Sequence, residues 1–301
     1  MSNDPLVSVC MVTFNHEVFI AKAIEGVLMQ EGDFDLRLII GDDASKDGTG
    51  EVCQQYADKY PQKILYYRNE TNLGPKLNFY KAMKMMSGEY IAFCEGDDYW
   101  TDPNKLQKQI VFLQENREYN ICFHKTKILL EDGRLVNDLI AKIPRSETTI
   151  DDLVRMANYI HTPSVVFRNN FILPEWYWNC PIGDYPLYLL AVRNGKIKCF
   201  DEPMAVYRFG GGFSKLSPVK KRIPWLITLN ELTENYPDER IRKKLVQKQR
   251  SAFLFFISIF LFFGDRDIKD LKSIVSIHIR FEKRNIMRFF RKNVVKKNAL
   301  K

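Results

Sequence analysis

Carboxylates are concentrated in a short segment that follows an apolar, strand-like run. Glu95, Asp97 and Asp98 form the sequence Glu-Gly-Asp-Asp directly after residues 89–94. Uncompensated carboxylates held close together repel one another, and a divalent cation resolves that repulsion. Mg²⁺ or Mn²⁺ held by one or two carboxylates completes its shell with water and phosphate oxygens. The segment therefore predicts a Mg²⁺ or Mn²⁺ site with a diphosphate ligand; the alternative is that these side chains cap the helix near residue 103.

A second polar segment, residues 41–49, also follows an apolar run and also opens a predicted helix. Its sequence is Gly-Asp-Asp-Ala-Ser-Lys-Asp-Gly-Thr. A carboxylate at such a turn can accept a hydrogen bond from a base N–H or a ribose hydroxyl, whereas the serine, the threonine and the last aspartate are ordinary turn and N-cap residues. We therefore assign a binding role to Asp43 first and to Asp42 second.

The elements that must position these side chains alternate between short β-branched runs and longer segments with helical spacing. This alternation is typical of β-α-β units, in which right-handed crossovers place helices against a mostly parallel sheet. Strands are predicted over 7–13, 36–40, 63–67 and 89–94, and helices over 16–30, 48–60 and 75–86. Ligands of open sheets of this kind collect at the carboxyl ends of the strands, where both acidic segments lie.

The remaining chain changes character at about residue 215. Before that point the α/β pattern continues, with strands predicted over 121–130 and 164–168 and helices over 104–115, 150–159 and 186–194. After it the composition becomes helical, basic and aromatic. We therefore expect an α/β domain over 1–215 and a helical extension over 216–301.

Four short segments carry a pattern in a fixed order: residues 7–15, 41–49, 72–74 and 88–98. Together they resemble family-two glycosyltransferases of the GT-A fold, and the resemblance covers roughly residues 6–215. It implies an inverting, metal-dependent transferase that moves a sugar from a nucleotide-diphosphate donor to a glycan or lipid-linked acceptor, as in surface-polysaccharide biosynthesis. It also implies a nucleotide-binding half over about 1–115 and an acceptor half over about 116–215.

The resemblance assigns roles to individual residues. Asp97 matches the metal-binding carboxylate, Asp98 a supporting neighbour, and Asp43 the hydrogen-bonding partner of the nucleotide. The further residues that it places around the donor are Val12, Thr13, Phe14, Glu17, Asn78, Glu95 and Gly96. The chain departs from the usual pattern in three segments: it has glutamate for aspartate at position 95, valine for proline at position 12, and no arginine before Asn78 in residues 75–78, where Lys76 is the candidate to supply the positive charge. These departures leave the choice of nucleotide open.

Residues 181–195 resemble the segment that opens the acceptor-side helix of the family, and Asp184 is the candidate catalytic base in it. Inversion needs a carboxylate within hydrogen-bond reach of the acceptor hydroxyl, to remove its proton as it attacks the anomeric carbon in line. Without the resemblance, the alternative interpretation is that Asp184 is the N-cap of the following helix. Arg208, in a Tyr-Arg pair before a glycine-rich stretch, is a candidate phosphate contact, with a surface ion pair as the alternative.

Two other functions fit parts of the sequence. A sugar nucleotidyltransferase also combines a Rossmann-like sheet with carboxylates and a metal, but it requires a glycine-rich, basic loop after the first strand, which is absent. A degenerate transferase acting as a membrane-bound scaffold is expected to lose its acidic site residues, whereas Asp43, Asp97 and Asp184 remain.

The formal net charge of +8 belongs to the C-terminal segment. Residues 266–301 contain twelve Lys+Arg and three Asp+Glu, so the rest of the chain is close to neutral. The apolar run 252–263 is too short to span a bilayer, at about 1.5 Å of rise per residue. Basic residues interleaved with aromatics suit an anionic membrane surface, the alternative being a helix that packs its aromatics on the core. Nucleic acid is not an expected partner.

The expected compartment is the cytoplasm, with the protein peripheral at the inner face of the membrane. The first residues lack the basic start of a secretory signal. The six cysteines form no Cys-x-x-Cys pair and lie far apart along the chain, so we expect buried, reduced thiols.

Overall fold

A computed structural model of the chain describes residues 7–138, 143, 145–210, 218–262 and 268–298. The chain divides into two structural units. The first comprises residues 1–174 and 183–214, and the second comprises 175–182 and 215–301. Besides the C-terminal extension, the second unit thus includes a short segment that the sequence analysis assigned to the α/β domain.

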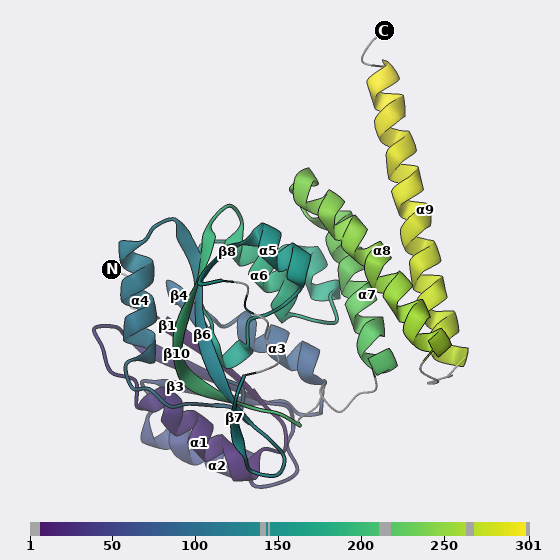
Figure 1. Ribbon diagram of the computed structural model, residues 1–301. Helices are drawn as coiled ribbons and strands as arrows, with labels where there is room; N and C mark the ends of the chain where they lie inside the picture. The colour runs from purple at the N-terminus through teal and green to yellow at the C-terminus, as the bar shows by residue number, and fades with distance from the viewer. Residues whose placement is uncertain (1–6, 139–142, 144, 211–217, 263–267, 299–301) are drawn as a thin grey trace. The chain divides into compact units, whose positions relative to one another are not determined.

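The N-terminal half of the first unit is a parallel sheet with the strand order β3-β2-β1-β4 (Figure 1). The strands are β1 (Val7–Thr13), β2 (Leu36–Asp42), β3 (Ile64–Arg68) and β4 (Tyr90–Phe93). The connecting helices are α1 (Glu17–Leu28), α2 (Thr49–Lys59) and α3 (Pro75–Met83). All seven elements were predicted, with boundaries within three residues of those observed.

The sheet continues into a mixed half, and the described residues contribute ten strands to it. The additional strands are β5 (Tyr99–Trp100), β6 (Tyr119–Leu129), β7 (Leu135–Asn137), β8 (Glu147–Thr149), β9 (Val166–Arg168) and β10 (Lys196–Arg208). β9 runs antiparallel to both β4 and β6, and β10 runs parallel to β6. The long β10 was not predicted, because the polar residues Asp201 and Glu202 interrupt its pattern where its register against β6 shifts.

The helices of this half are α4 (Lys105–Glu115), α5 (Ile150–Met156) and α6 (Asp184–Val192), with a 3₁₀ turn η1 (Thr162–Ser164). α5 ends three residues before the predicted end because Ala157 takes a φ of 72°. α6 begins two residues before the predicted start, at Asp184, and its N-cap is Gly183.

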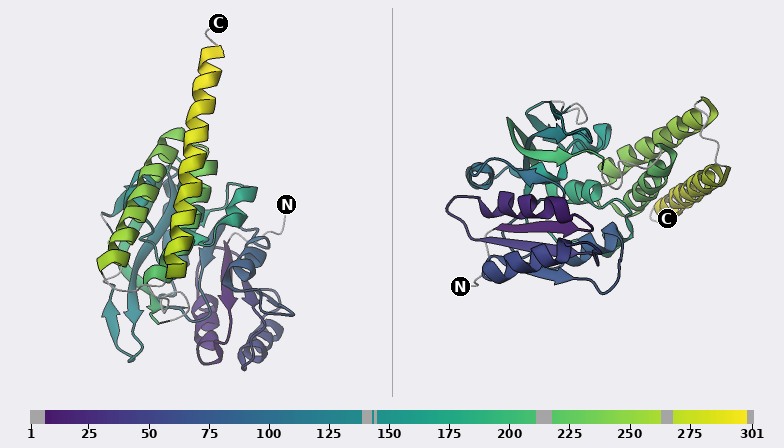
Figure 2. Two further views of the ribbon diagram at one scale, coloured as in Figure 1. Left: turned by 90° about the vertical axis from the view of Figure 1, so that its right-hand side faces the viewer. Right: turned by 90° about the horizontal axis from the view of Figure 1, so that it is seen from below.

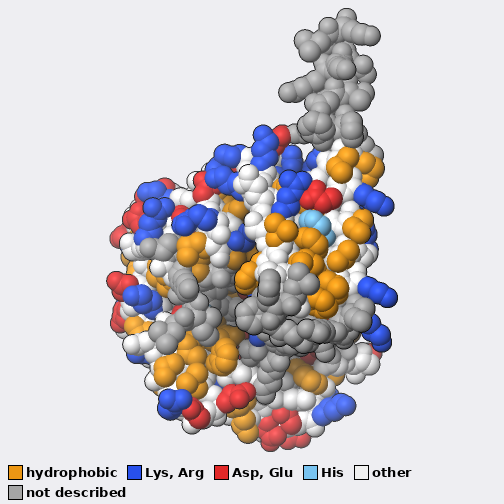
Figure 3. Space-filling view, turned by 45° about the vertical axis from the view of Figure 1, so that its right-hand side comes forward, with side chains coloured by type: hydrophobic (Ala, Val, Ile, Leu, Met, Phe, Trp, Pro, Cys, Tyr) orange, Lys and Arg blue, Asp and Glu red, His pale blue; other side chains and the backbone are white. Residues whose placement is uncertain are grey.

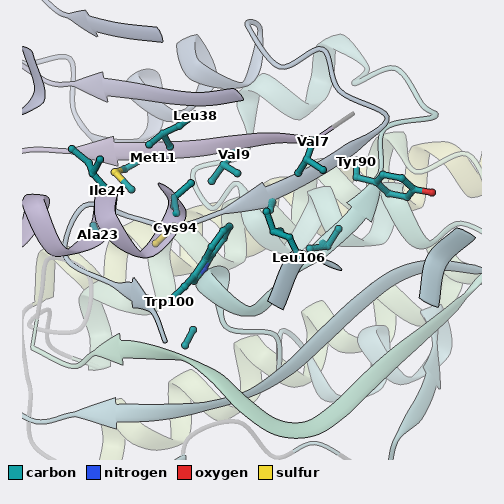
Figure 4. Packing of buried hydrophobic residues seen from close by; sticks show 14 of the residues in the cluster. Val7, Val9, Met11, Ala23, Ile24, Leu38, Tyr90, Cys94, Trp100 and Leu106 are labelled. Atoms are coloured by element: carbon teal, nitrogen blue, oxygen red, sulfur yellow. The ribbon is translucent and has the colours of Figure 1, made fainter. Parts of the chain in front are cut away.

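Alternate side chains of the central strands face the main apolar core (Figure 4). On β1, Val7, Val9 and Met11 point into this core, where they meet Ala23 and Ile24 of α1. α3 packs on β1 and β2, and all six cysteines are buried free thiols, as expected. The core thus fixes the directions of β1, β2 and β4, and with them the positions of the loops at their carboxyl ends.

In the described part of the second unit, three long helices lie side by side (Figure 2). These are α7 (Pro218–Asn235), α8 (Glu239–Phe262) and α9 (Ile268–Asn298), accompanied by a 3₁₀ turn η2 (Glu175–Asn179) that packs on α7. Their buried contacts centre on Leu226, Phe256, Ile274 and Ile277. Among the described helices, none combines the length and the apolar character that crossing a bilayer requires.

Candidate functional site

Two backbone hydrogen bonds join the carboxyl ends of three neighbouring strands. The N–H of Asp43, just after β2, donates to Thr13 O at 3.0 Å. The N–H of Gly96, just after β4, donates to Val12 O at 3.0 Å. The loops after β1, β2 and β4 therefore form one edge, and this edge contains most of the predicted donor-binding residues.

The loop after β1 is fixed by polar contacts with the start of α2. Asn15 has a φ of 55°, and its N–H donates to Ser45 Oγ at 2.9 Å, while the N–H of His16 donates to Thr49 Oγ1 at 2.8 Å. Of the predicted residues, Thr13 is buried and Phe14 is 38% exposed. This geometry leaves an aromatic side chain accessible on a fixed backbone.

Glu17 and Val12 lie differently in this loop. The Glu17 side chain is exposed and lies against Gly48, so that a Cβ added at Gly48 would meet Glu17 Oε1 at 2.6 Å. Val12 is half-buried, and its carbonyl accepts the hydrogen bond from Gly96.

The two aspartates after β2 are both buried and both make hydrogen bonds within the protein. Asp42 accepts hydrogen bonds from the Ser45 N–H and hydroxyl at 2.9 and 2.5 Å, and Arg68 Nε lies 3.4 Å from its other oxygen. Asp42 thus holds its own turn. Asp43 accepts from the backbone N–H groups of Leu73 and Gly74, each at 2.8 Å, and so ties the loop before α3 to the strand end.

Asn78 connects α3 to the same edge. Its side chain is buried, its Nδ2 donates to Gly41 O at 2.7 Å, and its Oδ1 accepts from Asn69 Nδ2 at 3.1 Å. Both ends of the amide are therefore used inside the protein. Lys76, two residues earlier, places its ammonium 5.5 Å from the centroid of the Tyr80 ring.

The loop after β4 brings three carboxylates together. One oxygen from each of Glu95, Asp97 and Asp98 lies within 4.8 Å of the others. Gly96 lies so close to the β1 loop that an added Cβ would come 2.6 Å from Thr13 Oγ1 and 2.9 Å from His16 Nδ1. Only a residue without a side chain fits at position 96 without displacing that loop.

Electrostatics couple this cluster to Asp184. Burial raises the pKa of the Glu95 carboxyl, and the charges of Asp97 and Asp184 raise it further. Burial also raises the pKa of Asp98, with Asp97 and Glu95 as the next causes. An added positive charge would reverse these shifts, because an opposite charge favours the ionised form of a carboxyl.

The donor set of the cluster fits a hard divalent cation. Asp98 Oδ1 accepts the backbone N–H of Arg208 at 2.8 Å, whereas its Oδ2 is buried and has no hydrogen-bond partner in the described structure. An unpartnered buried carboxylate oxygen is costly, and carboxylates are the oxygen ligands that Mg²⁺ and Mn²⁺ prefer. The cluster therefore has the composition and the unmet charge of a metal site.

Two positive or titratable side chains flank the cluster. Arg208, at the end of β10, donates through Nε to Asp97 O at 3.0 Å, and its guanidinium carbon lies 3.9 Å from the centroid of the Phe19 ring. His16 Nδ1 contacts Thr13 Oγ1 at 3.2 Å, and its Nε2 lies 4.0 Å from Asp97 Oδ2. The sequence analysis gave His16 no role, although a histidine three residues after a strand end was a usable signal.

Asp184 is the first residue of α6, and the N-cap of that helix is Gly183. The alternative reading of Asp184 as an N-cap is therefore wrong. Its Oδ1 accepts the N–H of Tyr185 at 2.7 Å, and its Oδ2 accepts from Asn158 Nδ2, also at 2.7 Å. Burial raises the pKa of the Asp184 carboxyl. Asn158 is a contact that the sequence analysis missed.

Known proteins are similar in sequence to this chain to different extents. An uncharacterized protein of Mycobacterium tuberculosis (Rv1520) is 36% identical over 201 residues, which cover 67% of this chain and 58% of that protein. The putative teichuronic acid biosynthesis glycosyltransferase TuaG of Bacillus subtilis is 34% identical over 149 residues, 50% of this chain and 57% of that protein. The chain thus spans a little over half the length of these relatives.

Structural comparison supports the same fold. The crystal structure of S. aureus TarS 1–349 in complex with UDP-GlcNAc aligns with a TM-score of 0.66 at 20% identity, covering 91% of this chain and 80% of that one. At this identity the likeness shows the fold alone, which is the expected GT-A fold. Residues 8–172, more than half of the chain, match the model of the family described as Glycosyl transferase family 2. The chain therefore belongs to glycosyl transferase family 2.

Proposed function

We propose that this protein is an inverting glycosyltransferase that moves a sugar from a nucleotide-diphosphate donor to a glycan or lipid-linked acceptor. The observation that carries the proposal is that one oxygen from each of Glu95, Asp97 and Asp98 lies within 4.8 Å of the others, while the charge of Asp184 helps to raise the pKa of Glu95. A candidate base and a cluster suited to a cation thus act on each other within one site, as a displacement at an anomeric carbon next to a diphosphate requires.

The donor is proposed to bind along the edge formed by the loops after β1, β2 and β4. Phe14 offers an exposed ring for a base, and TarS, which shares the fold, was crystallised with UDP-GlcNAc. Further backbone and side-chain contacts to the donor are proposed from residues along the same edge, which are Val12, Thr13, Glu17 and Gly96. The buried positions of Asp43 and Asn78 favour a different contribution, which is to hold the loop before α3 where the nucleotide binds.

Glu95, Asp97 and Asp98 are the residues that would hold Mg²⁺ or Mn²⁺. A divalent cation bound there would stabilise the negative charge of the departing diphosphate. Arg208 is proposed as a second positive contact to the diphosphate, because its guanidinium is held beside the cluster by the bond from Nε to Asp97 O.

Asp184 is proposed to accept the proton of the acceptor hydroxyl. Each of its oxygens accepts one hydrogen bond from the protein, and a carboxylate oxygen has two lone pairs. Each oxygen therefore keeps a lone pair for the incoming hydroxyl. The hydroxyl oxygen attacks the anomeric carbon from the face opposite the nucleoside diphosphate, Asp184 takes the proton, and the bond from the anomeric carbon to the diphosphate oxygen breaks. The product therefore has inverted configuration at the anomeric carbon.

The acceptor is proposed to be a growing surface polysaccharide or a lipid-linked precursor at an anionic membrane. TuaG is named for teichuronic acid biosynthesis, which supports a polymer acceptor.

The helical unit exposes apolar side chains next to lysines and arginines (Figure 3). The exposed apolar residues are Leu254, Phe255, Ile279, Ile286 and Met287, and Arg280 and Lys283 lie within the same stretch of α9. A surface of this kind suits anionic headgroups. The basic residues beyond Arg288 lie outside the described side chains.

The test of the transferase proposal is metal-dependent donor binding, measured by thermal shift with a panel of nucleotide-diphosphate sugars. A ligand that binds only the folded state raises its stability. We expect one donor to raise the melting temperature with Mn²⁺ or Mg²⁺ present, no effect in Asp97→Ala, and an undiminished shift in Asp184→Asn. Asp184→Asn should nevertheless abolish transfer; full turnover by this variant would remove Asp184 as the base. The absence of a shift with every donor would favour an enzyme that binds its acceptor first, or the scaffold alternative.

The membrane part of the proposal has a separate test. The double substitution Arg280→Glu/Lys283→Glu reverses two exposed charges of α9 and should lower binding to phosphatidylglycerol-containing vesicles by about thirtyfold, at about 1 kcal/mol per basic residue near the surface. Lys59→Glu/Lys63→Glu, which reverses two charges of the α/β unit, is the matched control. Equal vesicle binding by the two double variants would show that α9 is not the membrane contact.

A further inference from the structure

Within the described residues, a side chain from outside α6 donates a hydrogen bond to the carboxylate of Asp184. Asn158 lies in the segment between α5 and η1, and its Nδ2 donates to Asp184 Oδ2 at 2.7 Å. Both residues are partly buried, so water only partly screens this bond. The interaction joins two segments that are 26 positions apart in the sequence.

The orientation of the Asn158 amide is set by a second hydrogen bond. Its Oδ1 accepts the backbone N–H of Ile160 at 3.0 Å, which forms a local turn. Because the oxygen end faces Ile160, the amino end faces Asp184. Asn158 can therefore only donate to the carboxylate, and a donor favours the ionised form of its acceptor.

The backbone just before Asn158 is strained. Ala157 has a φ of 72°, and its N–H still closes the last turn of α5 on Leu153 O at 2.9 Å. With a ψ of −166°, this is a conformation that glycine adopts and other residues rarely do, and it costs an alanine about 1–3 kcal/mol. Such a conformation persists where surrounding contacts hold it, and it clusters at functional sites. Here it turns the chain at the end of the helix, so that residue 158 meets α6.

We propose that Asn158 is the positioning residue of the candidate base: it holds one oxygen of Asp184 and leaves the carboxylate ionised and aimed for the acceptor hydroxyl. This inference rests on the proposed role of Asp184. Burial raises the pKa of Asp184, and the bonds from Asn158 and from the Tyr185 N–H oppose that rise.

Other titratable groups face Asp184 from three elements. They are Glu95 in the loop after β4, Tyr207 on β10 and Tyr188 on α6, each with a pKa that the charge of Asp184 helps to raise. None of these groups is cationic at neutral pH, so Asn158 supplies a stabilisation of the Asp184 carboxylate that they cannot.

The test measures the ionisation of Asp184 itself. In metal-free protein labelled with ¹³C at the aspartate carboxyls, the Asp184 signal is identified by its loss in Asp184→Asn. We expect Asn158→Ala to raise the titration midpoint of this signal by about one pH unit, the order of one hydrogen bond to a charged group. Asn158→Asp, which adds a like charge, should raise it further. Asn116→Ala, which removes an asparagine that only caps α4 through Phe112 O, should leave it unchanged.

Kinetics distinguish failure of this inference from failure of the proposed function. If the wild type transfers sugar, the acid limb of its kcat/KM profile should move upward in Asn158→Ala by the same amount, with the donor KM unchanged. If the wild type transfers no sugar from any donor, the transferase proposal fails, and the ¹³C titration still tests the Asn158 contact. Asn158→Ser, which keeps an acceptor for Ile160, replaces Asn158→Ala if the latter does not fold. An unchanged midpoint in a folded variant overturns the inference.

Discussion

Lys105 is a charged residue in the core of the α/β unit, and its burial makes a quantitative prediction. Its side chain is completely buried at the start of α4, where Nζ donates to Gln109 Oε1 at 2.8 Å and lies 4.0 Å from the centroid of the Trp100 ring. Burial lowers the pKa of Lys105 to about 7. Below that pH the folded protein must hold an ammonium in its core.

The sign of the effect follows from proton binding. The pKa of Lys105 is about 7 in the folded state and 10.5 in its reference state, so between these values the unfolded chain binds more protons. Stability therefore rises with pH through this window and is lowest below pH 7. Two pH units above the folded pKa, at about 1.36 kcal/mol per unit, give a gain of about 2.7 kcal/mol between pH 6 and pH 9.

The substitution Lys105→Met removes this titration. Its stability relative to the wild type should be about 2.7 kcal/mol more favourable at pH 6 than at pH 9. The difference between the two pH values cancels any constant cost of leaving Gln109 Oε1 without its donor. Urea unfolding at both pH values measures it, and Lys108→Met, one turn later and exposed, is the control with no differential. Parallel pH profiles for the wild type and Lys105→Met would refute a neutral, buried Lys105.

Two other substitutions test the candidate site. Gly96→Ala places a methyl group 2.6 Å from Thr13 Oγ1, so we expect a loss of about 1–3 kcal/mol in urea unfolding and a loss of the donor-induced thermal shift. Gly133→Ala adds a Cβ with no atom within 4 Å, and although the φ of 83° strains an alanine there, this variant should keep the donor-induced shift. Loss of that shift in both variants would contradict the steric argument. Arg208→Gln should weaken binding of the nucleoside diphosphate by about tenfold, the order of one charge-assisted bond, and leave nucleoside binding unchanged. Equal weakening of both ligands, measured by calorimetry, would place Arg208 away from the phosphates.

The parallel half of the fold could be predicted because each of its strands and helices has a recognisable local sequence pattern. Buried parallel strands are short runs of β-branched residues, and the helices between them carry amphipathic spacing. β10 could not be predicted in this way, because Asp201 and Glu202 sit at an irregularity that only its pairing with β6 makes possible. The early end of α5 could not be predicted from the sequence either, because the alanine at position 157 gives no indication of a φ of 72°.

The sequence indicated which strand ends form the candidate site, but it did not indicate which side chains contact one another there. Sequence pattern and family resemblance indicated Glu95, Asp97 and Asp184, which lie in one electrostatic environment. Asn158 was missed because an isolated asparagine after a helix is ordinary, and its role depends on a neighbour 26 positions away. Long-range pairs of this kind have no local sequence signature.

The predicted donor residues include buried side chains that form hydrogen bonds within the protein and an exposed side chain that can contact a ligand. Substitutions in these two groups should affect stability and donor affinity differently. Asp43 and Asn78 are buried and use their polar atoms on Gly74 and Gly41, so they hold the loops together. Phe14 is exposed, and its ring is free to meet a ligand. Substituting a buried, bonded residue removes support from the loop, so stability and donor affinity should fall together. Substituting Phe14 changes the contact alone, and donor affinity should fall at constant stability. A loss of donor affinity therefore identifies a direct contact only where the free energy of unfolding is unchanged.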